Sequence, residues 1–183
     1  ETFFASLGAI TNFGGGNLTI AAGGGTGTGT ITDNDVATVA INSPAPVAEG
    51  TGVTFTVTLT GAVQGGFTIA YNTANNTAIQ PGDYTSTSGT LNFTGTNGET
   101  KTFTVTTIDD LLVEPTETFF ASLGAITGFG GGNLTIAAGG GTGTGTITDN
   151  DVATVAINSP AAVVEGNPVT FTVTLTGAVQ GGF

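Results

Sequence analysis

The sequence contains no cysteine, histidine, methionine or tryptophan. Without histidine or cysteine it has no imidazole to act as a general base, no thiolate nucleophile and none of the nitrogen or sulfur ligands usual in zinc sites. A carboxylate pair of the glycosidase type is the one remaining route to catalysis. Aromatic side chains that could stack on a sugar are scarce, since the chain has only two tyrosines. We therefore do not expect an enzyme.

Positive charge is almost absent as well. Lys101 is the only basic residue beside 13 acidic ones, which gives a formal net charge of −12. Such a chain repels phosphates, so nucleic acid is not an expected partner. The sequence has no apolar run of membrane-spanning length, and we expect no membrane insertion.

The chain repeats itself with a period of 116 residues. Residues 1–67 and 117–183 are identical at 62 of 67 positions. This period matches the size of an independent domain and is too long for a solenoid unit. We expect residues 1–35 to be the C-terminal part of a first repeat, 36–151 a complete repeat, and 152–183 the N-terminal part of a third. Because Glu1 is not a methionine, we also expect a segment of a longer protein.

Hydrophobic periodicity indicates an all-β protein. Residues 53–59, Val-Thr-Phe-Thr-Val-Thr-Leu, alternate apolar and threonine side chains, which predicts that Val53, Phe55, Val57 and Leu59 share one face of a sheet. No long stretch has the helical period. Turn signals such as Pro81-Gly82 and Asn97-Gly98 separate short strands, as in an immunoglobulin-like antiparallel β-sandwich of about seven strands. The expected strands are 37–42, 53–60, 67–73, 89–94, 101–108, 117–123 and 142–148.

The last of these strands conflicts with ordinary strand propensity. Its sequence, Gly-Thr-Gly-Thr-Gly-Thr, has no apolar side chain before Ile147, and glycine loses much backbone entropy when it becomes ordered.

Eight of the nine acidic residues of the complete repeat fall at four places that a sandwich would bring together at one end. Only Glu99, in a predicted hairpin, lies apart. The four places are Glu49; Asp83; the run Asp109, Asp110, Glu114 and Glu117; and the tripeptide Asp149-Asn150-Asp151. Two carboxylates about 4 Å apart repel each other by roughly 4 kcal/mol at an effective dielectric constant of 20. Calcium, which accepts six to eight oxygens in irregular geometry, would relieve this repulsion.

These spaced motifs resemble a Calx-β domain, and the resemblance covers residues 36–151 and part of both flanks. The matching motifs, in order, are Glu49-Gly50, Thr77-Ala78, Gly82-Asp83-Tyr84, Gly89 to Phe93, Ile108-Asp109-Asp110, Glu114, Glu117-Thr-Phe119 and Ile147 to Asp151. Calx-β domains are calcium-binding β-sandwiches. They occur as regulatory modules of sodium/calcium exchangers and as tandem repeats in large bacterial surface proteins.

Carried over position by position, the resemblance implies calcium ligands at Glu49, Asp83, Asp109, Asp110, Glu114, Asp149 and Asp151. Glu117 and Asn150 are further candidate ligands, although Glu117, which matches an acidic family position, is interpreted first as ordering a loop. Asn150 replaces the middle Asp of the closing triplet, and Leu111 stands where the more acidic exchanger domain has a third Asp. These departures suggest that the domain binds fewer calcium ions or binds them more weakly. The equivalents in the partial repeats are Asp33, Asp35 and Glu165.

A simpler interpretation of each acid stays open. Asp and Asn favour turns because their side chains bond to nearby backbone, and Asp149-Asn150-Asp151 would form such a turn without any metal.

Two functions follow from the calcium interpretation. The first is a structural repeat that extends and rigidifies an extracellular adhesin stalk or surface filament, with adjacent identical repeats and other copies of the chain as partners. The second is a calcium-responsive binding or regulatory module. Near-identical neighbours favour the first, because an array that grows by duplication needs spacing more than distinct sites. Weak sites of the extracellular type would be filled outside a cell, on a bacterial surface or in a secreted protein. The sequence does not identify an adhesive ligand.

Overall fold

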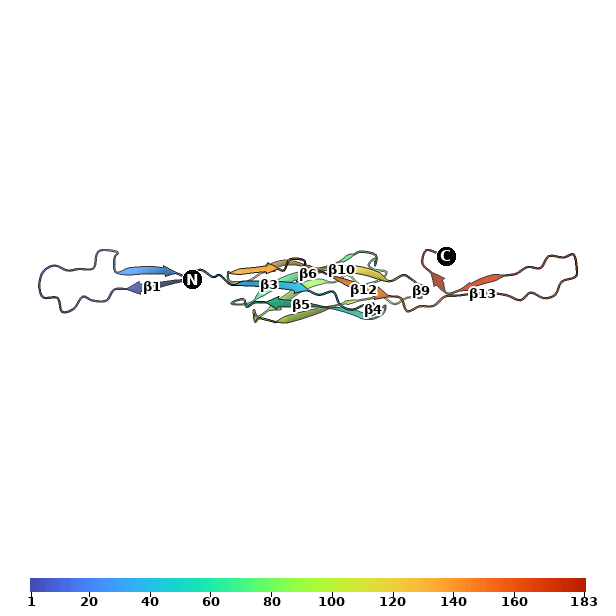
Figure 1. The fold of residues 1–183 in the computed structure, drawn as a ribbon, viewed down its shortest axis with the longest axis horizontal. Coiled ribbons are helices and arrows are strands. Elements are labelled where there is room, and N and C mark those ends of the chain that lie inside the picture. The colour runs from blue at the N-terminus through green and yellow to red at the C-terminus, as the bar shows by residue number, and fades with distance from the viewer. The chain divides into compact units, whose positions relative to one another are not determined.

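The computed structural model describes all 183 residues, which form strands and no helix (Figure 1). No helix capable of crossing a membrane is therefore present. Contacts along the chain divide it into two units, Glu1–Asp35 and Val36–Phe183.

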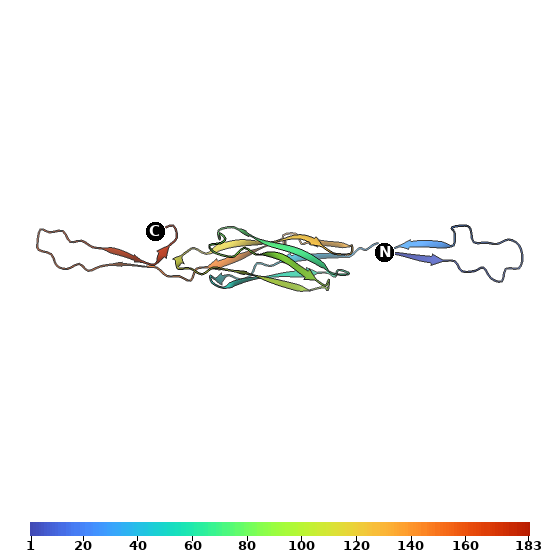
Figure 2. The same ribbon diagram turned by 180° about the vertical axis from the view of Figure 1, so that it is seen from behind.

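Two sheets packed face to face make up the larger part of the second unit. Their strands lie side by side in both views of the ribbon (Figures 1 and 2). The first sheet has the order β4 (Val47–Ala48), β12 (Thr142–Thr148), β10 (Glu117–Thr127), β6 (Phe67–Asn75) and β7 (Ser88–Phe93). The second has the order β11 (Asn133–Ile136), β3 (Val36–Ile41), β5 (Gly52–Thr60) and β8 (Thr100–Thr106). The predicted immunoglobulin-like all-β sandwich is thus confirmed.

All seven expected strands are present, and two short ones are added at the sheet edges. β4 pairs in parallel with β12, and β11 pairs in parallel with β3. β4 has only two residues, too few for an alternating pattern, whereas β11, Asn-Leu-Thr-Ile, does alternate polar and apolar side chains but was not among the expected strands. β10 is longer than expected, because a shift of register between Leu123 and Ile126 lets it continue along β6 as far as Thr127.

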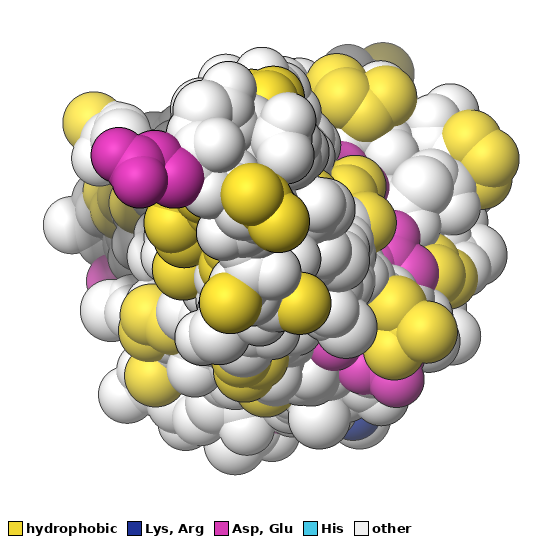
Figure 3. Space-filling model, turned by 90° about the vertical axis from the view of Figure 1, so that its right-hand side faces the viewer, with side chains coloured by type: hydrophobic (Ala, Val, Ile, Leu, Met, Phe, Trp, Pro, Cys, Tyr) yellow, Lys and Arg dark blue, Asp and Glu magenta, His cyan; other side chains and the backbone are white.

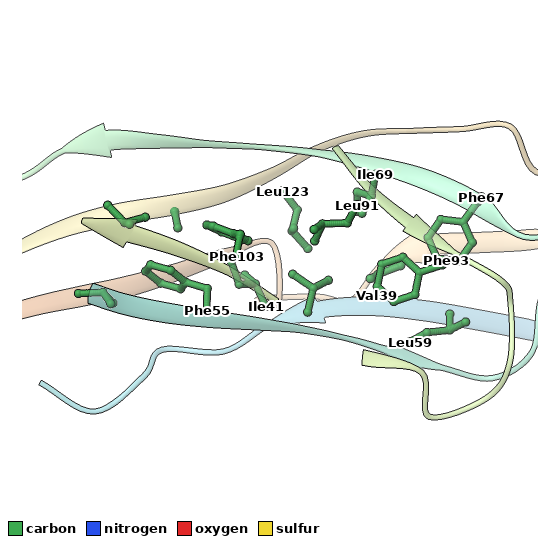
Figure 4. Packing of buried hydrophobic residues seen from close by; sticks show 14 of the residues in the cluster. Val39, Ile41, Phe55, Leu59, Phe67, Ile69, Leu91, Phe93, Phe103 and Leu123 are labelled. Carbon is green, nitrogen blue, oxygen red and sulfur yellow. The ribbon is translucent and has the colours of Figure 1, made fainter. Parts of the chain in front are cut away.

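The core lies between the two sheets and is built from the apolar face of each strand. Val53, Phe55, Val57 and Leu59 of β5 are fully buried, as their alternation with threonine predicts. Figure 4 shows Phe55, Leu59 and Val39 on one side and Ile69, Leu91 and Leu123 on the other. On the outer face of β5, Thr54 and Thr104 share a hydrogen bond of 2.9 Å between their hydroxyl oxygens. Threonine suits this exposed face because its hydroxyl forms hydrogen bonds and its branched side chain favours the strand conformation.

The glycines of β12 make room for larger neighbours. Gly145 lies opposite Phe119 of β10, and a Cβ at Gly145 would lie 2.5 Å from Cζ of that ring. A Cβ at Gly143 would collide with the carbonyl oxygen of Asn42 at 2.1 Å. The Phe119 ring therefore fills the space that a side chain of β12 would otherwise occupy, and stacks on Tyr84 with ring centroids 4.5 Å apart. This packing explains a strand of low intrinsic propensity.

The first unit holds the antiparallel pair β1 (Thr2–Ser6) and β2 (Thr26–Thr30). Its register reproduces that of β10 and β12, with Phe3 opposite Gly29 as Phe119 is opposite Gly145. Phe3 is 55 % exposed, whereas Phe119 is fully buried. Residues 1–35 contain no equivalents of the strands that cover Phe119.

Residues 152–183 form β13 (Thr154–Ile157), β14 (Val173–Thr176) and β15 (Ala178–Val179), and β15 pairs with β9 (Leu112–Val113) of the complete repeat. The contacts therefore group residues 152–183 with 36–151 in one unit. The division of the chain into three repeats stays a prediction from the sequence period.

We expect Gly145→Ala to lower the free energy of unfolding by about 1 to 3 kcal/mol, the usual cost of overpacking a core. The added Cβ would overlap the buried Phe119 ring, which is packed against Tyr84 and Phe55. Gly130→Ala is the matched control, since its Cβ would meet only the Gln64 carbonyl oxygen at 4.0 Å. Urea denaturation of both variants measures the difference; equal stabilities would contradict the proposed role of Gly145.

Candidate metal centre

Strand register brings Glu49 beside Asp149. β4 and β12 run in parallel with Ala48 opposite Thr148, so the next residue of each strand leaves the sheet at the same edge. The Glu49 N–H donates to the Thr148 carbonyl oxygen at 3.1 Å, and the Asn150 N–H donates to Glu49 Oε1 at 3.3 Å. Two loops about 100 residues apart in sequence are therefore held together by backbone pairing.

The remaining acids reach the same end of the sandwich through the neighbouring strands. Glu117 opens β10 opposite Ile147, near the end of β12. Asp83 lies between β6 and β7, where its carbonyl oxygen accepts a bond of 2.9 Å from the N–H of Ile108. Asp109 follows Ile108 directly. The expectation that the sandwich gathers four separated places in the sequence agrees with this arrangement.

The first acidic cluster consists of Glu49, Asp149 and Asp151. Each contributes a carboxylate oxygen, and these oxygens lie within 4.8 Å of one another. Glu49 is buried, and the other two are half-buried. Asp149 Oδ1 accepts a bond of 3.1 Å from the Asp151 N–H, whereas Asp151 Oδ2 is buried and has no hydrogen-bond partner. This oxygen is an acceptor without a donor.

The second acidic cluster consists of Asp83, Glu114 and Glu117, again with oxygens within 4.8 Å of one another. Glu117 is buried at the first position of β10. Its Oε2 has no hydrogen-bond partner. Each acidic cluster therefore contains one buried carboxylate oxygen that no protein donor satisfies.

Glu117 lies deeper in the site than a loop-ordering residue would. The signal for this was in the alternation of β10, because Glu117 shares its sheet face with Phe119 and Ala121, which are fully buried. Because Glu117 is the first residue of this inward-facing row, its carboxylate is buried at the end of the core.

Asp109, Asp110 and Asn150 lie outside both three-residue clusters. Asn150 Nδ2 donates to Asp109 Oδ1 at 3.2 Å, and the Leu112 N–H donates to Asp110 Oδ1 at 2.7 Å. Gly50 has a φ of +73°, and a Cβ there would lie 2.9 Å from Cβ of Asp109. Glycine next to Glu49 therefore lets the two acidic loops approach each other closely.

Burial and mutual repulsion disfavour the charged form of several of these acids. Desolvation, a hydrogen bond to Asp83 and the negative charges of Asp83 and Glu114 raise the pKa of Glu117 to about 7. Desolvation also raises the pKa of Glu49 and Glu114, and the nearby aspartates add to both shifts. The pKa of Asp151 is raised by desolvation and then by the charges of Asp149, Asp109 and Asp110.

Asp110 links the two clusters electrostatically. Its charge contributes to the raised pKa of Glu49 and Asp151 in the first cluster and of Glu114 in the second. The acidic residues thus behave as one negatively charged region.

Glu99 is the opposite case. Its carboxylate accepts hydrogen bonds from the Thr94 N–H and the Gly95 N–H, and Oε1 lies 3.0 Å from Lys101 Nζ. Desolvation acts to raise its pKa, but the bonds from Lys101, Thr94 and Gly95 outweigh it and lower the pKa to about 2. The sequence predicted an ordinary hairpin residue here; the structure adds that Glu99 orders the turn with the only cation of the chain.

The acids of the partial repeats are exposed. Asp33 Oδ1 accepts a bond of 3.0 Å from the Asp35 N–H, the same turn that joins Asp149 to Asp151. Glu165 forms no acidic cluster, because the chain contains no third-repeat equivalents of Asp109 or Asp149 to meet it.

The donor set fits a hard cation such as calcium. It offers only oxygen ligands, it includes two buried oxygens without donors, and the one lysine is engaged by Glu99. Figure 3 shows acidic side chains at several places on one face and little basic surface. Calcium prefers carboxylate oxygens and tolerates the irregular geometry that several loops provide. The residues of both clusters would hold it.

Solved structures with the same fold include Calx domains, one of them described as a calcium binding domain. The chain aligns with a crystal structure of the apo-form Calx CBD1 domain at 22 % identity and a TM-score of 0.54, over 64 % of this chain and 100 % of that one. It aligns with the calcium binding domain CBD12 of CALX1.1 at 24 % identity and a TM-score of 0.51, over 60 % of this chain and 42 % of that one. At these identities the likeness concerns the fold. Among curated proteins, no relative matches.

The family profile of the Calx-beta domain matches residues 32–157, which is more than half of the chain and includes every residue of both acidic clusters. The match agrees with the sandwich topology and with the motifs that the sequence carries. The chain therefore belongs to the Calx-beta domain family.

Proposed function

We propose that this chain is a calcium-binding structural repeat that extends and rigidifies an extracellular stalk or filament. The observation that carries the proposal is the pair of three-carboxylate clusters at one end of the sandwich, each with a buried oxygen that no protein group satisfies. Membership of the Calx-beta family and the resemblance of the fold to a calcium binding domain support the same ion.

Electrostatics requires a counterion at this end. Two carboxylates 4.8 Å apart repel each other by roughly 3 to 4 kcal/mol at an effective dielectric constant of 20. The complete repeat has nine acidic residues and one basic residue, a net charge of −8. Two to four calcium ions would remove half to all of this charge. Three carboxylates offer up to six oxygens to one ion. The charges of Asp109 and Asp110 also act on members of the clusters.

The position of the first cluster supports a mechanical role. Asp149 and Asp151 end the complete repeat, and only Val152 and Ala153 separate Asp151 from β13. The chain has no flexible glycine- and serine-rich linker at this point. An ion that holds Asp149 and Asp151 against Glu49 would fix the path by which the chain leaves the sandwich.

Near-identity of the repeats favours a stalk over a sensor. Residues 1–67 and 117–183 differ at only five positions. None of the five is acidic, so Asp33, Asp35 and Glu165 match their equivalents in the complete repeat. An array of equal units provides length and equal spacing. A surface or secreted location would keep sites with dissociation constants of roughly 0.1 to 1 mM filled.

A calcium-responsive regulatory module is the second candidate, favoured by the likeness of the fold to the calcium binding domain of CALX1.1. The two differ in affinity. Binding near millimolar calcium fits a permanently loaded strut, and submicromolar binding fits an intracellular sensor.

Calcium should bind the 183-residue chain and stabilise it by about 1.4 kcal/mol per ion when free calcium is tenfold above the dissociation constant. We expect Asp149→Ala and Asp83→Ala to weaken binding or remove an ion, because each deletes an oxygen of one cluster. Glu99→Ala is the control, since Glu99 bonds only to its own turn and Lys101. Calorimetric titration and thermal unfolding measure both effects. An unchanged midpoint in calcium, or equal losses in all three variants, would contradict the site.

In chelator, stability should fall as the pH rises from about 4.5 through 7. The pKa of Glu117 is raised from 4.5 to about 7 in the folded chain, so folding favours the protonated carboxyl. This stabilisation is complete below pH 4.5 and is lost above pH 7, by an amount on the order of 3 kcal/mol. Glu49, Glu114 and Asp151 are shifted in the same direction.

Urea denaturation between pH 4.5 and 8 tests this dependence. Glu117→Gln keeps a neutral side chain of the same size and should flatten the curve. If the free energy of unfolding does not fall with pH in chelator, burial does not disfavour the charged form of these carboxyls in the folded chain.

The stalk proposal predicts a change of shape with calcium. A protein of three or more complete repeats should be a stiff rod in millimolar calcium and a more compact, flexible chain in chelator. Without the ion, the backbone at Asp149 and Asp151 is no longer held, and the repulsion among the carboxylates is no longer balanced. Small-angle scattering measures the maximum dimension. The same dimension in both conditions, with both samples folded by circular dichroism, would show that calcium does not set the joint.

A further inference from the structure

A loop of the third repeat contacts the complete repeat at β9. β15 pairs in parallel with β9, with Ala178 opposite Leu112 and Val179 opposite Val113. The Gln180 N–H donates to the Val113 carbonyl oxygen at 3.0 Å. Beyond the backbone, Gln180 Nε2 donates to Glu114 Oε1 at 2.9 Å. A residue of the following repeat thus bonds directly to a member of the second acidic cluster.

The contacting loop has the conformation that it takes in a complete repeat. Thr154 pairs with Thr176 as Thr38 pairs with Thr60, at positions 116 residues apart. The turn glycine at 177 has a φ of +93° and its equivalent at 61 has a φ of +86°. Each turn also packs on the same two residues, which are Val152 and Ala153 at 177 and Val36 and Ala37 at 61. The contact with β9 therefore requires no rearrangement of the loop.

The complete repeat leaves the same groups of this loop free. Val63, the equivalent of Val179, is buried and directs its N–H to the Gly95 carbonyl oxygen of its own repeat at 2.8 Å. Gln64, the equivalent of Gln180, is exposed, and its backbone N–H and side chain make no hydrogen bond within the repeat. Neighbouring residues of an extended strand point their backbone groups to opposite sides. One side of the loop thus serves its own core, and the other is available to a neighbour.

We propose that successive repeats dock through this two-residue parallel pairing, and that the glutamine at position 180 completes the second acidic cluster of the repeat before it. Gln180 is a positioning residue: its amide N–H holds Glu114, while Asp83, Glu114 and Glu117 supply the charge. Each such cluster along an array is then shared by two repeats. The role of Gln180 in calcium binding rests on the proposed function, whereas the docking of the loop does not.

Glutamine suits this position for a chemical reason. A neutral amide donates to one carboxylate without adding charge to a site meant for a cation, and a lysine there would compete with the ion. Metal binding and docking of the next repeat should therefore favour each other. An ion that orders Glu114 favours its bond with Gln180, and docking through Gln180 in turn orders Glu114 for the ion.

Cysteine cross-linking in the 183-residue chain tests the docking, since the chain has no cysteine of its own. Leu112→Cys with Ala178→Cys places thiols at paired positions, and Leu112→Cys with Thr176→Cys places them two residues out of register. We expect the paired variant to form its intramolecular disulfide at least about tenfold faster under mild oxidation, because disulfides require Cα atoms within about 7 Å. Equal rates would mean that residues 152–183 move freely, and would overturn the docking.

Calcium titration of Gln180→Ala tests the link to the acidic cluster, with Gln64→Ala as its matched control. Both glutamines stand in the sequence Gly-Ala-Val-Gln-Gly-Gly-Phe, but only Gln180 has a Glu114 to meet in this chain. We expect Gln180→Ala to weaken one calcium-binding step by about tenfold, the typical effect of losing a residue that orients a ligand. Gln64→Ala should leave every step unchanged. Equal affinities for the two variants would overturn the role of Gln180 while leaving the proposed function intact.

The two experiments separate the failures. A chain that binds no calcium would refute the proposed function and with it the role of Gln180, and the cross-linking rates would still decide whether the loop docks. A chain that binds calcium but cross-links equally in both registers would refute the docking, and with it the role of Gln180, while the proposed function would stand.

Discussion

Repulsion among carboxylates at one end of the sandwich is the constraint on which the rest of this structure depends. Six of them stand in two groups whose oxygens lie within 4.8 Å, and no cation of the protein is near enough to balance them. Burial makes the repulsion stronger, as the raised pKa of Glu117 shows. The fold gathers these groups with backbone hydrogen bonds and a core that lies elsewhere, so the site is a cost to folding that an ion would offset.

The sandwich that offsets this unfavourable free energy is built from a few types of residue. Valine, leucine and phenylalanine fill the interior, threonine covers the exterior, and glycine appears where an aromatic ring needs the space. The pairing of Phe119 with Gly145 illustrates how packing across two strands replaces the propensity that one strand lacks. Because stability comes from this core, the loops at the acidic end are free to hold groups that oppose folding.

The acidic end is also the end at which one repeat passes into the next. Asp151 closes the first cluster just before β13 begins, and Gln180 reaches Glu114 of the second cluster. The acidic clusters, the exit of the chain and the contact with the following repeat therefore share the same few residues. In the array that we propose, a change at either cluster would alter the joint, and no separate linker would be needed.

The sequence by itself determined the fold class, the inward-facing row of β5 and the set of acids that gather at one end. Each of these depends on a regular local pattern: a period of two, a turn signal, or acids placed just beyond a strand. The 116-residue period also indicated a tandem array. The sequence pattern was insufficient for β4 and β9, which have two residues each, and β11 alternates over only four residues and was not among the expected strands.

Only the tertiary structure decided how the acids are divided. Asp109 and Asp110 look like the centre of the site in sequence, yet neither belongs to the two acidic clusters, and Glu117 joins one because its strand position carries it inward. The same is true of Gln180, an ordinary loop residue until the third repeat contacts β9. The physical reason is that ligand groups are defined by distances of a few ångströms between loops. Those distances follow from which strands far apart in the chain become neighbours, as β4 and β12 do, and local sequence does not encode that pairing.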